Sequence, residues 1–299
     1  MGKLKNVLTW SFSRGRLFNE CRRAYYYQYY ASWGGWERNS DELARKAYIL
    51  KNVRNMDAWI GDIVHQAIKW ILRTMLNGEG VTLDQARNTI KHQLVKTWEQ
   101  SRSSAWEKNI KNNLNLLEHY YKREPTREEL SRRIRKAVES IYNFYNSGLI
   151  DNFSKLEKEN FLTIDELDSF NFEGVKTFAI PDLAIKTNKY CLYDWKTGKP
   201  SEKDVLQLSC YVLYAVSKWG LDPEDVNIIP IYLTQKGFST DAVMPVNIDI
   251  VKTHIRGSLA EMRAVLLDVK NNKIDAKLCP KAEDSWRCKN CKFQEICLD

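Results

Sequence analysis

Apolar residues in the first half of the chain recur at the three- and four-residue spacing that is typical of helices. Over residues 56–76 they form one stripe, which predicts a single helix. Residues 9–32 are expected to form another helix, rich in aromatic side chains, that ends where Trp33-Gly34-Gly35-Trp36 breaks the pattern. The stripe of the 56–76 helix consists of Ile60, Ile63, Val64, Ala67, Ile68, Ile71 and Leu72.

Residues 82–147 are also predicted to be helical. Thr126-Arg127-Glu128-Glu129 follows Pro125 and has the spacing of a capping box, so a helix is expected to begin there and run to about Tyr145. Asn146-Ser147-Gly148 would end it. The stretch has no evident catalytic chemistry, and we interpret it as a large helical insertion.

The pattern changes after residue 150, where apolar runs suit strands. Strands are expected at 155–164, 175–187, 190–194 and 226–234, and helices at 205–219 and 248–270. The strand, helix, strand order predicts an α/β fold with a mixed sheet that helices cover. We expect four segments: an N-terminal helical segment at 1–55, a helical region at 56–150, the sheet core at 151–247, and a C-terminal helix with a Cys-rich tail at 248–299.

Composition and charge narrow the class of protein. No apolar run approaches the ~18 residues of a membrane span, and the N-terminus has no apolar export signal, so we expect a cytoplasmic protein. The net charge is +8, and residues 1–55 hold 11 Lys and Arg against 4 Asp and Glu. This excess indicates a polyanionic partner such as nucleic acid, although a solubilising surface explains it equally well.

Basic and aromatic residues alternate near the N-terminus. Arg14, Arg16, Arg22 and Arg23 are candidates for a groove that binds a phosphate backbone. The aromatic residues between them are favoured as core rather than as a platform for bases.

Two carboxylates and an ammonium group stand at the ends of two predicted strands. Asp182 follows Ile180-Pro181, and twelve residues later Asp194 precedes Trp195-Lys196. Carboxylate oxygens suit Mg²⁺ or Mn²⁺, and a lysine beside the ion can hold an attacking water. The set suits metal-assisted hydrolysis of a phosphodiester. The alternative, a plain strand end and turn, is equally compatible with these residues alone.

Three further polar residues lie on predicted helices. His65 borders the apolar stripe of the 56–76 helix, where a satisfied core histidine is the commoner explanation and metal ligation the alternative. Gln207 and Tyr211 share one helical face by their i, i+4 spacing. They suit contacts to substrate phosphates or support of Lys196, with ordinary helix packing as the alternative.

The seven cysteines in a chain without an export signal argue against a disulfide scaffold. Cys288, Cys291 and Cys297 fall within ten residues, which is a strong metal signal. Either Cys21 or Cys279 would complete a set of four thiolates for Zn²⁺ or an iron–sulfur cluster. Cys191 and Cys210 are expected to be buried small side chains.

The ordered set of motifs resembles the PD-(D/E)XK nuclease superfamily, and within it the RecB-type nucleases with an iron–sulfur cluster. These include AddB-type helicase–nuclease subunits and the CRISPR-associated exonuclease that trims DNA before spacer capture. The resemblance spans nearly the whole chain. It rests on the Cys21 segment from Phe18, Gly61-Asp62-Ile63-Val64-His65, Ile180-Pro181-Asp182, Asp194-Trp195-Lys196-Thr197-Gly198, Gln207 to Tyr211, Cys288-Lys289-Asn290-Cys291 and Cys297.

The resemblance implies a restriction-endonuclease-like core and a role for each motif. His65, Asp182 and Asp194 would ligate Mg²⁺ or Mn²⁺, with the Trp195 carbonyl as a further ligand. Lys196 would position the attacking water and help to deprotonate it, while Gln207 and Tyr211 would contact substrate or support the site. A [4Fe–4S] cluster would be held by Cys21, Cys288, Cys291 and Cys297, joining the first helix to the C-terminal tail.

The chain departs from the family pattern at two positions. Arg22 replaces the proline that often follows the first cysteine, and Trp195 replaces the usual tyrosine. An upstream strand glutamate often helps the site, and Glu157 and Glu159 are both candidates. There is no G-x-x-x-x-G-K-[ST] loop for ATP, so unwinding would need a partner helicase.

The expected activity is therefore a metal-dependent DNA exonuclease that acts on single strands or ends, with DNA, a helicase or CRISPR adaptation proteins as partners. The alternative is a non-catalytic iron–sulfur or zinc subunit that binds nucleic acid within a repair or CRISPR complex.

Overall fold

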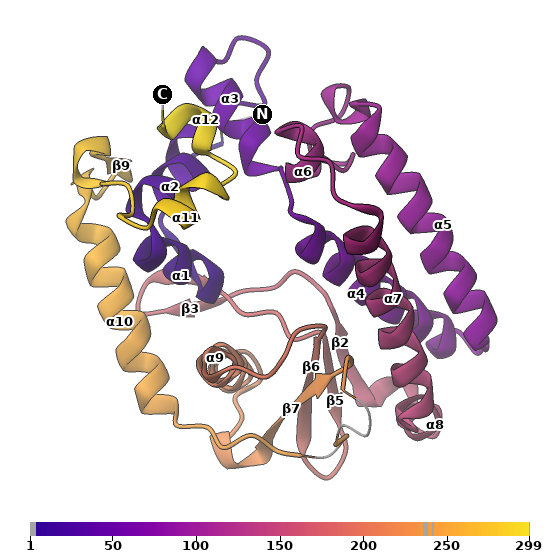
Figure 1. The fold of residues 1–299 in the computed structure, drawn as a ribbon. Helices are drawn as coiled ribbons and strands as arrows, with labels where there is room; N and C mark the ends of the chain where they lie inside the picture. The colour runs from indigo at the N-terminus through magenta and orange to yellow at the C-terminus, as the bar shows by residue number, and fades with distance from the viewer. Residues whose placement is uncertain (1–3, 236–238, 241, 299) are drawn as a thin grey trace.

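The computed structural model describes residues 4–235, 239–240 and 242–298. Residues 1–3, 236–238, 241 and 299 lie outside the described residues. They belong to the expected segments 1–55, 151–247 and 248–299. A four-stranded sheet stands between two groups of helices (Figure 1), so the expectation of a mixed α/β fold is confirmed. Its order is β2 (Phe161–Ile164), β5 (Leu183–Lys186), β6 (Tyr190–Lys196) and β7 (Val226–Tyr232).

The predicted crossover is present in this sheet. β6 and β7 pair in parallel and are connected through α9 (Glu202–Trp219) and the turn η4 (Pro223–Asp225), whereas β5 pairs antiparallel with both β2 and β6. Parallel strands need such a crossover, and a helix that returns across the sheet supplies it. The arrangement is consistent with a restriction-endonuclease-like core.

The strand predicted over 175–187 is divided between two sheets. β4 (Val175–Phe178) pairs with β1 (Thr9–Ser11) and β3 (Phe170–Phe172), and β5 begins only after Asp182. The segment 179–182 crosses between the sheets, and Pro181 within it has no N–H to donate to a ladder. The strand β3 itself lies outside the strand ranges expected from the sequence.

Helices on one side of the sheet share its first core. α4 (Met56–Leu76) has the predicted limits, and α5 (Leu83–Arg102) and α7 (Arg127–Asn146) pack on it. The capping box from Thr126 to Glu129 is confirmed. The helix predicted through 82–147 is interrupted at 103–126, where the structure has only the short elements η2 (Ala105–Glu107) and α6 (Leu117–Tyr120). Two further short elements, α8 (Leu149–Phe153) and η3 (Lys158–Asn160), follow α7.

A second core lies on the opposite face of the sheet. There α9 packs on β7 and on α10 (Ile248–Ala264), and Trp10 and Phe18 are fully buried with them. The sheet is thus enclosed on both sides. The helix predicted to reach residue 270 ends at Ala264 and is followed by β8 (Leu266–Asp268) and β9 (Lys273–Ile274).

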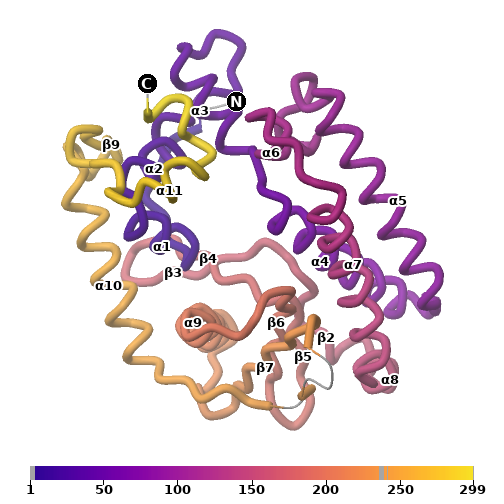
Figure 2. The backbone as a smooth tube through the Cα atoms, in the orientation of Figure 1, coloured from indigo at the N-terminus to yellow at the C-terminus, as the bar shows by residue number. Residues whose placement is uncertain are grey.

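The N-terminal aromatic segment is not one helix. It forms β1, α1 (Phe12–Glu20), α2 (Arg22–Tyr26) and a π-helical turn η1 (Tyr27–Ala31), and α3 (Glu42–Lys51) follows. Cys21 interrupts the helices because its backbone is extended and its Sγ caps α2 by accepting a hydrogen bond from the Ala24 N–H at 3.4 Å. Figure 2 shows this segment beside the C-terminal elements η5 (Ala276–Leu278), α11 (Ser285–Lys289) and α12 (Gln294–Cys297).

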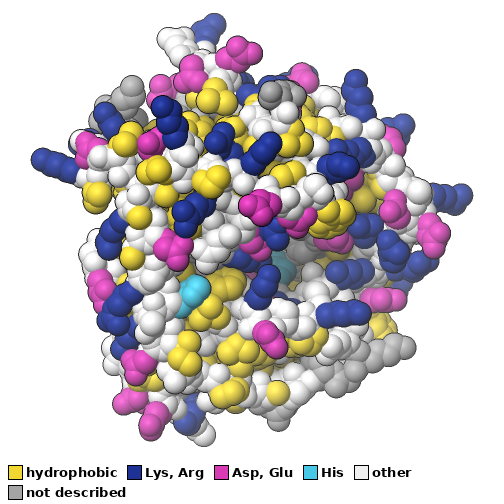
Figure 3. Space-filling view, turned by 60° about the vertical axis from the view of Figure 1, so that its left-hand side comes forward, with side chains coloured by type: hydrophobic (Ala, Val, Ile, Leu, Met, Phe, Trp, Pro, Cys, Tyr) yellow, Lys and Arg dark blue, Asp and Glu magenta, His cyan; other side chains and the backbone are white. Residues whose placement is uncertain are grey.

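The surface shows no single basic patch on the face in Figure 3, where Lys and Arg side chains are spread widely with Asp and Glu among them. Arg14, expected in a phosphate groove, is buried, and its guanidinium lies 4.3 Å from the ring centre of Tyr29. Arg23 donates from Nε to the Cys279 carbonyl. None of the helices in the described ranges is long and apolar enough to cross a bilayer.

Candidate active site

The two predicted carboxylates meet at the ends of β5 and β6. Asp182 immediately precedes β5, and the register pairs Leu183 with Tyr193, next to Asp194. The Trp195 N–H donates to Asp182 Oδ2 at 2.7 Å, which ties the two strands together at this point. Both acids are buried, with 9% of Asp182 and 4% of Asp194 exposed.

Alternation along β6 places Asp194 and Lys196 on one face and Trp195 on the other. Lys196 Nζ lies 2.9 Å from Asp194 Oδ2. The Trp195 ring stacks on Tyr193 at 5.8 Å and meets the edge of Phe144 at 5.4 Å, inside the first core. The departure from the usual tyrosine therefore changes a core side chain and leaves the polar face of β6 intact.

His65 reaches Asp182 from α4. Its Nδ1 lies 3.0 Å from Asp182 Oδ1, and its side chain is 32% exposed. Burial of the ring lowers the pKa of His65, but the charge of Asp182 and the hydrogen bond to it outweigh this and raise the pKa to about 9. In this structure His65 is a charged partner of Asp182 and not a core histidine.

Gln207 and Tyr211 reach the site from α9. Tyr211 donates from Oη to Asp194 Oδ1 at 3.0 Å, and Lys196 donates from Nζ to Gln207 Oε1 at 3.1 Å. Gln207 Nε2 in turn donates to Tyr211 Oη at 3.4 Å. Burial, followed by the charge of Asp194, raises the pKa of Tyr211 well above its usual range, so the phenol keeps its proton. The pair braces Asp194 and Lys196 together.

Sequence reasoning missed two acids near the site. Asp204, which also caps α9 from its first turn, lies 3.8 Å from Lys196 Nζ and accepts from Tyr232 Oη at 3.0 Å. Its position three residues before Gln207 was the available signal. Asp165 follows β2; its N–H donates to the Asp182 carbonyl at 2.9 Å, and its carboxylate pairs with Lys69 at 3.0 Å.

The two candidate upstream glutamates, Glu157 and Glu159, do not lie on a strand beside Asp182 and Asp194. Glu157 and Glu159 are exposed and belong to the η3 turn before β2. The neighbouring Asn160 donates to the Lys186 carbonyl, at the end of β5 that is opposite to Asp182. The strand predicted from residue 155 begins only at Phe161, and this places both glutamates at the wrong end.

Carboxylate oxygens and an imidazole nitrogen, the groups found at this site, are ligand types that suit a divalent cation. Burial and the neighbouring Asp182 carboxylate raise the pKa of Asp194, so the two acids share one electrostatic environment. Asp194 Oδ2 is buried and accepts no hydrogen bond from the described residues, because Lys196 approaches it only as an ion pair. Within the same residues, no group of three or more His, Cys, Asp or Glu is arranged to hold a metal. His65 and Lys196 neutralise the two acids instead.

The comparison with known families decides the class. A family model described as the PD-(D/E)XK nuclease superfamily matches residues 9–298. The chain belongs to this superfamily. A search of the curated proteins gives no match.

The cysteines of this superfamily member gather away from the carboxylates. Cys21, Cys288, Cys291 and Cys297 line one cavity of about 410 Å³ between α2 and the C-terminal tail. Burial, and then the nearby Cys21, raises the pKa of the Cys297 thiol. Cys291 Sγ accepts a hydrogen bond from the Phe293 N–H at 3.4 Å, as Cys21 does from Ala24. Thiols are the ligands that metal clusters use, but among the described residues no three of these cysteine side chains are arranged to hold a metal.

Of the remaining cysteines, Cys279 lies near Cys21, and burial, with a smaller contribution from Cys21, raises the pKa of the Cys279 thiol. Cys279 is fully buried in the second core and does not line this cavity. Cys210 is buried on α9, as expected, and Cys191 is partly buried on β6. Cys21 therefore lines the same cavity as the three C-terminal cysteines, whereas Cys279 does not.

Proposed function

We propose that the protein is a Mg²⁺- or Mn²⁺-dependent deoxyribonuclease of the RecB type, and that it is an exonuclease acting on single strands or DNA ends. The observation that carries this proposal is the convergence of Asp182, Asp194 and Lys196 where β5 and β6 meet. Membership of a nuclease superfamily over residues 9–298 supports it.

Asp182, Asp194 and His65 would hold the cation, with the Trp195 carbonyl as a further donor. His65 would give up its proton on binding, because only the neutral imidazole ligates a metal. When bound, the cation would supply Lewis acidity at the scissile phosphate. Every other group at the site has a role of its own. Asp182 ties the two strands, and its Oδ1 is the atom that His65 reaches.

Lys196 handles the attacking water in this proposal. Its ammonium group forms an ion pair with Asp194 Oδ2 and donates a hydrogen bond to Gln207 Oε1, so its position is fixed before substrate arrives. A donor fixed in this way orients the water and stabilises the charge that develops on the phosphate oxygens without reorganising. Tyr211 keeps Asp194 in place and Gln207 keeps Lys196 in place.

The cysteine cavity is the second part of the proposal. Cys21, Cys288, Cys291 and Cys297 would bind a [4Fe–4S] cluster whose role is structural. Protein contacts already hold the tail there: Tyr27 donates from Oη to the Ile296 carbonyl at 2.7 Å, and Lys46 pairs with Glu295 at 2.6 Å. A cluster would add a covalent tie between segments that are far apart in the sequence.

The mode of action is tested with a panel of end-labelled substrates. Linear and circular DNA, single- and double-stranded, are digested with Mg²⁺ and with Mn²⁺. An exonuclease shortens linear strands from an end and leaves circles intact. Cleavage of circles would replace the exonuclease by an endonuclease. Absence of cleavage on these substrates and on matching RNA substrates would favour the non-catalytic subunit, whose partners would be a helicase or CRISPR adaptation proteins in the cytoplasm.

A further inference from the structure

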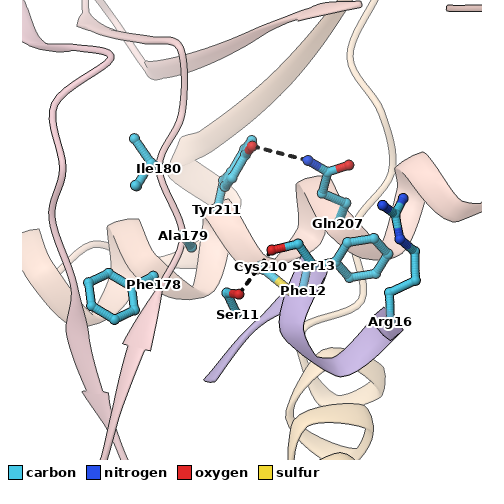
Figure 4. A pocket seen from close by; sticks show the side chains of 10 residues that line it. All are labelled: Ser11, Phe12, Ser13, Arg16, Phe178, Ala179, Ile180, Gln207, Cys210 and Tyr211. Atoms are coloured by element: carbon cyan, nitrogen blue, oxygen red, sulfur yellow. Dashed lines mark hydrogen bonds between the residues drawn. The ribbon is translucent and has the colours of Figure 1, made fainter. Parts of the chain in front are cut away.

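A cavity of about 350 Å³ opens beside the carboxylates, between the start of α1 and the middle of α9 (Figure 4). The floor is the segment that crosses between the sheets, Phe178 to Ile180. Its volume falls at the lower end of the ~300–1,000 Å³ found for small-ligand sites. The cavity is therefore large enough for a compact group and too small for a duplex.

The lining divides into a polar rim and an aromatic wall. Arg16 and Ser13 on α1 and Gln207 on α9 supply the polar groups. Arg16 is exposed, and among the described residues its one ion pair is a loose contact of 3.9 Å with Glu20 on its own helix. A weakly held guanidinium beside a hydroxyl and an amide is suited to a phosphate group.

Phe12 supplies a partly exposed aromatic surface, and the rest of its side chain packs against the second core. It lines the cavity, is only partly buried, and makes no ring-to-ring contact with another described residue. The Phe178 ring, by contrast, already has Lys176 Nζ 5.1 Å from its centre. An unpaired ring at the wall of a polar-rimmed cavity is a stacking surface for a planar base.

The cavity adjoins the catalytic groups through two residues. Gln207 and Tyr211 both line it, and the same side chains hydrogen-bond Lys196 and Asp194. Gln207 Nε2 uses one of its two N–H bonds on Tyr211, and the other makes no hydrogen bond within the described part of the chain. A ligand in the cavity would therefore sit next to the groups that act on the scissile phosphate.

We propose that this cavity binds one unpaired nucleotide adjacent to the cleaved phosphate, with Arg16 on its phosphate and Phe12 against its base. The proposal rests on the proposed nuclease function and would account for the proposed action on single strands or ends.

The test measures binding and not cleavage, so its result can be interpreted whether or not the protein proves to be a nuclease. Single-stranded oligonucleotides, each with one abasic position, are bound to Lys196→Ala protein in Ca²⁺ and followed by fluorescence anisotropy. At one position the missing base should weaken binding about tenfold, as expected for the loss of one stacked base. In a Phe12→Leu background the penalty at that position should disappear, while penalties elsewhere persist.

Arg16→Ala provides an independent arm, because the side chain is exposed and its removal leaves the fold intact. It should weaken binding about five- to tenfold and reduce the slope of log affinity against log salt by about 0.7, the value for one phosphate contact on a single strand. Arg87→Ala is the matched control: Arg87 is a similarly exposed arginine with a loose helical ion pair of 3.7 Å to Asp84. It should change neither quantity.

Two results would overturn the subsite. One is an abasic penalty that Phe12→Leu leaves unchanged at every position. The other is a salt slope for Arg16→Ala equal to that of Arg87→Ala. If either result appeared together with metal-dependent cleavage by the wild type, the subsite would be wrong and the nuclease function would remain.

Discussion

Asp182 accepts the backbone N–H of Trp195 through one carboxylate oxygen at 2.7 Å and faces His65 with the other at 3.0 Å. One side chain thus joins β5 to β6 and α4 to the sheet. Its structural and chemical roles can be separated, because the first needs only an acceptor and the second needs a charge.

Asp182→Asn should therefore abolish cleavage but preserve folding. The amide oxygen still accepts from Trp195, whereas the negative charge that attracts a cation is gone. Asp182→Ala should abolish cleavage too, and it should also lower the free energy of unfolding by about 1–3 kcal/mol, because the buried N–H of Trp195 is left without a partner. Urea denaturation of the two variants makes the comparison; equal stability would show that the strand tie is unimportant.

Trp195 should tolerate the tyrosine that is usual in the family. The ring lies in the first core, 2% exposed, against Tyr193 and Phe144. Trp195→Tyr should keep cleavage near the wild-type rate, whereas Trp195→Ala should lower the free energy of unfolding by about 3–5 kcal/mol. Thermal denaturation and rate per folded molecule are the readouts. A large loss of rate in well-folded Trp195→Tyr would mean that the indole takes part in the chemistry.

Tyr211→Phe should reduce kcat about tenfold and change KM little. The substitution removes the hydrogen bond from Tyr211 Oη to Asp194 Oδ1 and keeps the packing of the ring. Tyr214→Phe is the matched control, since Tyr214 lies on the same helix and donates to Asp168 away from the site. Steady-state kinetics of both variants provide the comparison. Identical kcat values for Tyr211→Phe and Tyr214→Phe would show that Tyr211 is not a positioning residue.

If the cysteine cavity holds the proposed iron–sulfur cluster, the protein should be coloured and should contain iron. Protein purified without oxygen should be brown and contain iron, and Cys21→Ala should lose the iron and lower the melting temperature. Cys279→Ala, which alters a cysteine outside the cavity, should keep the iron. Stoichiometric zinc without visible absorbance would refute the iron–sulfur assignment and leave the nuclease proposal untouched.

Local patterns in the sequence were sufficient where one element contains the whole signal. The limits of α4 follow from a stripe of apolar residues that a single helix can bury, and the α7 capping box is local by nature. The placement of Asp182, Asp194 and Lys196 also followed, because adjacent strands and alternation along β6 are enough to bring them together.

Tertiary contacts decided the features that were missed. Residues 9–11 have a helical pattern but pair with β4, whose position depends on residues 175–178. Arg14 has the composition of a surface residue, yet it is buried because three tyrosine rings surround its guanidinium. Asp165 approaches the site only because β2 runs antiparallel to β5, and the local sequence does not determine the direction in which two strands pair.

The central claim is that Lys196, held between Asp194 and Gln207, performs chemistry on a phosphodiester. The most direct measurement is the single-turnover cleavage of labelled single-stranded DNA in Mg²⁺ and in Mn²⁺ by wild type, Lys196→Ala and Lys186→Ala, the last being an exposed lysine of β5 in the same sheet. We expect metal-dependent cleavage by the wild type and by Lys186→Ala, and a loss of at least about a hundredfold in Lys196→Ala with DNA binding retained. Undiminished cleavage by Lys196→Ala would contradict the account.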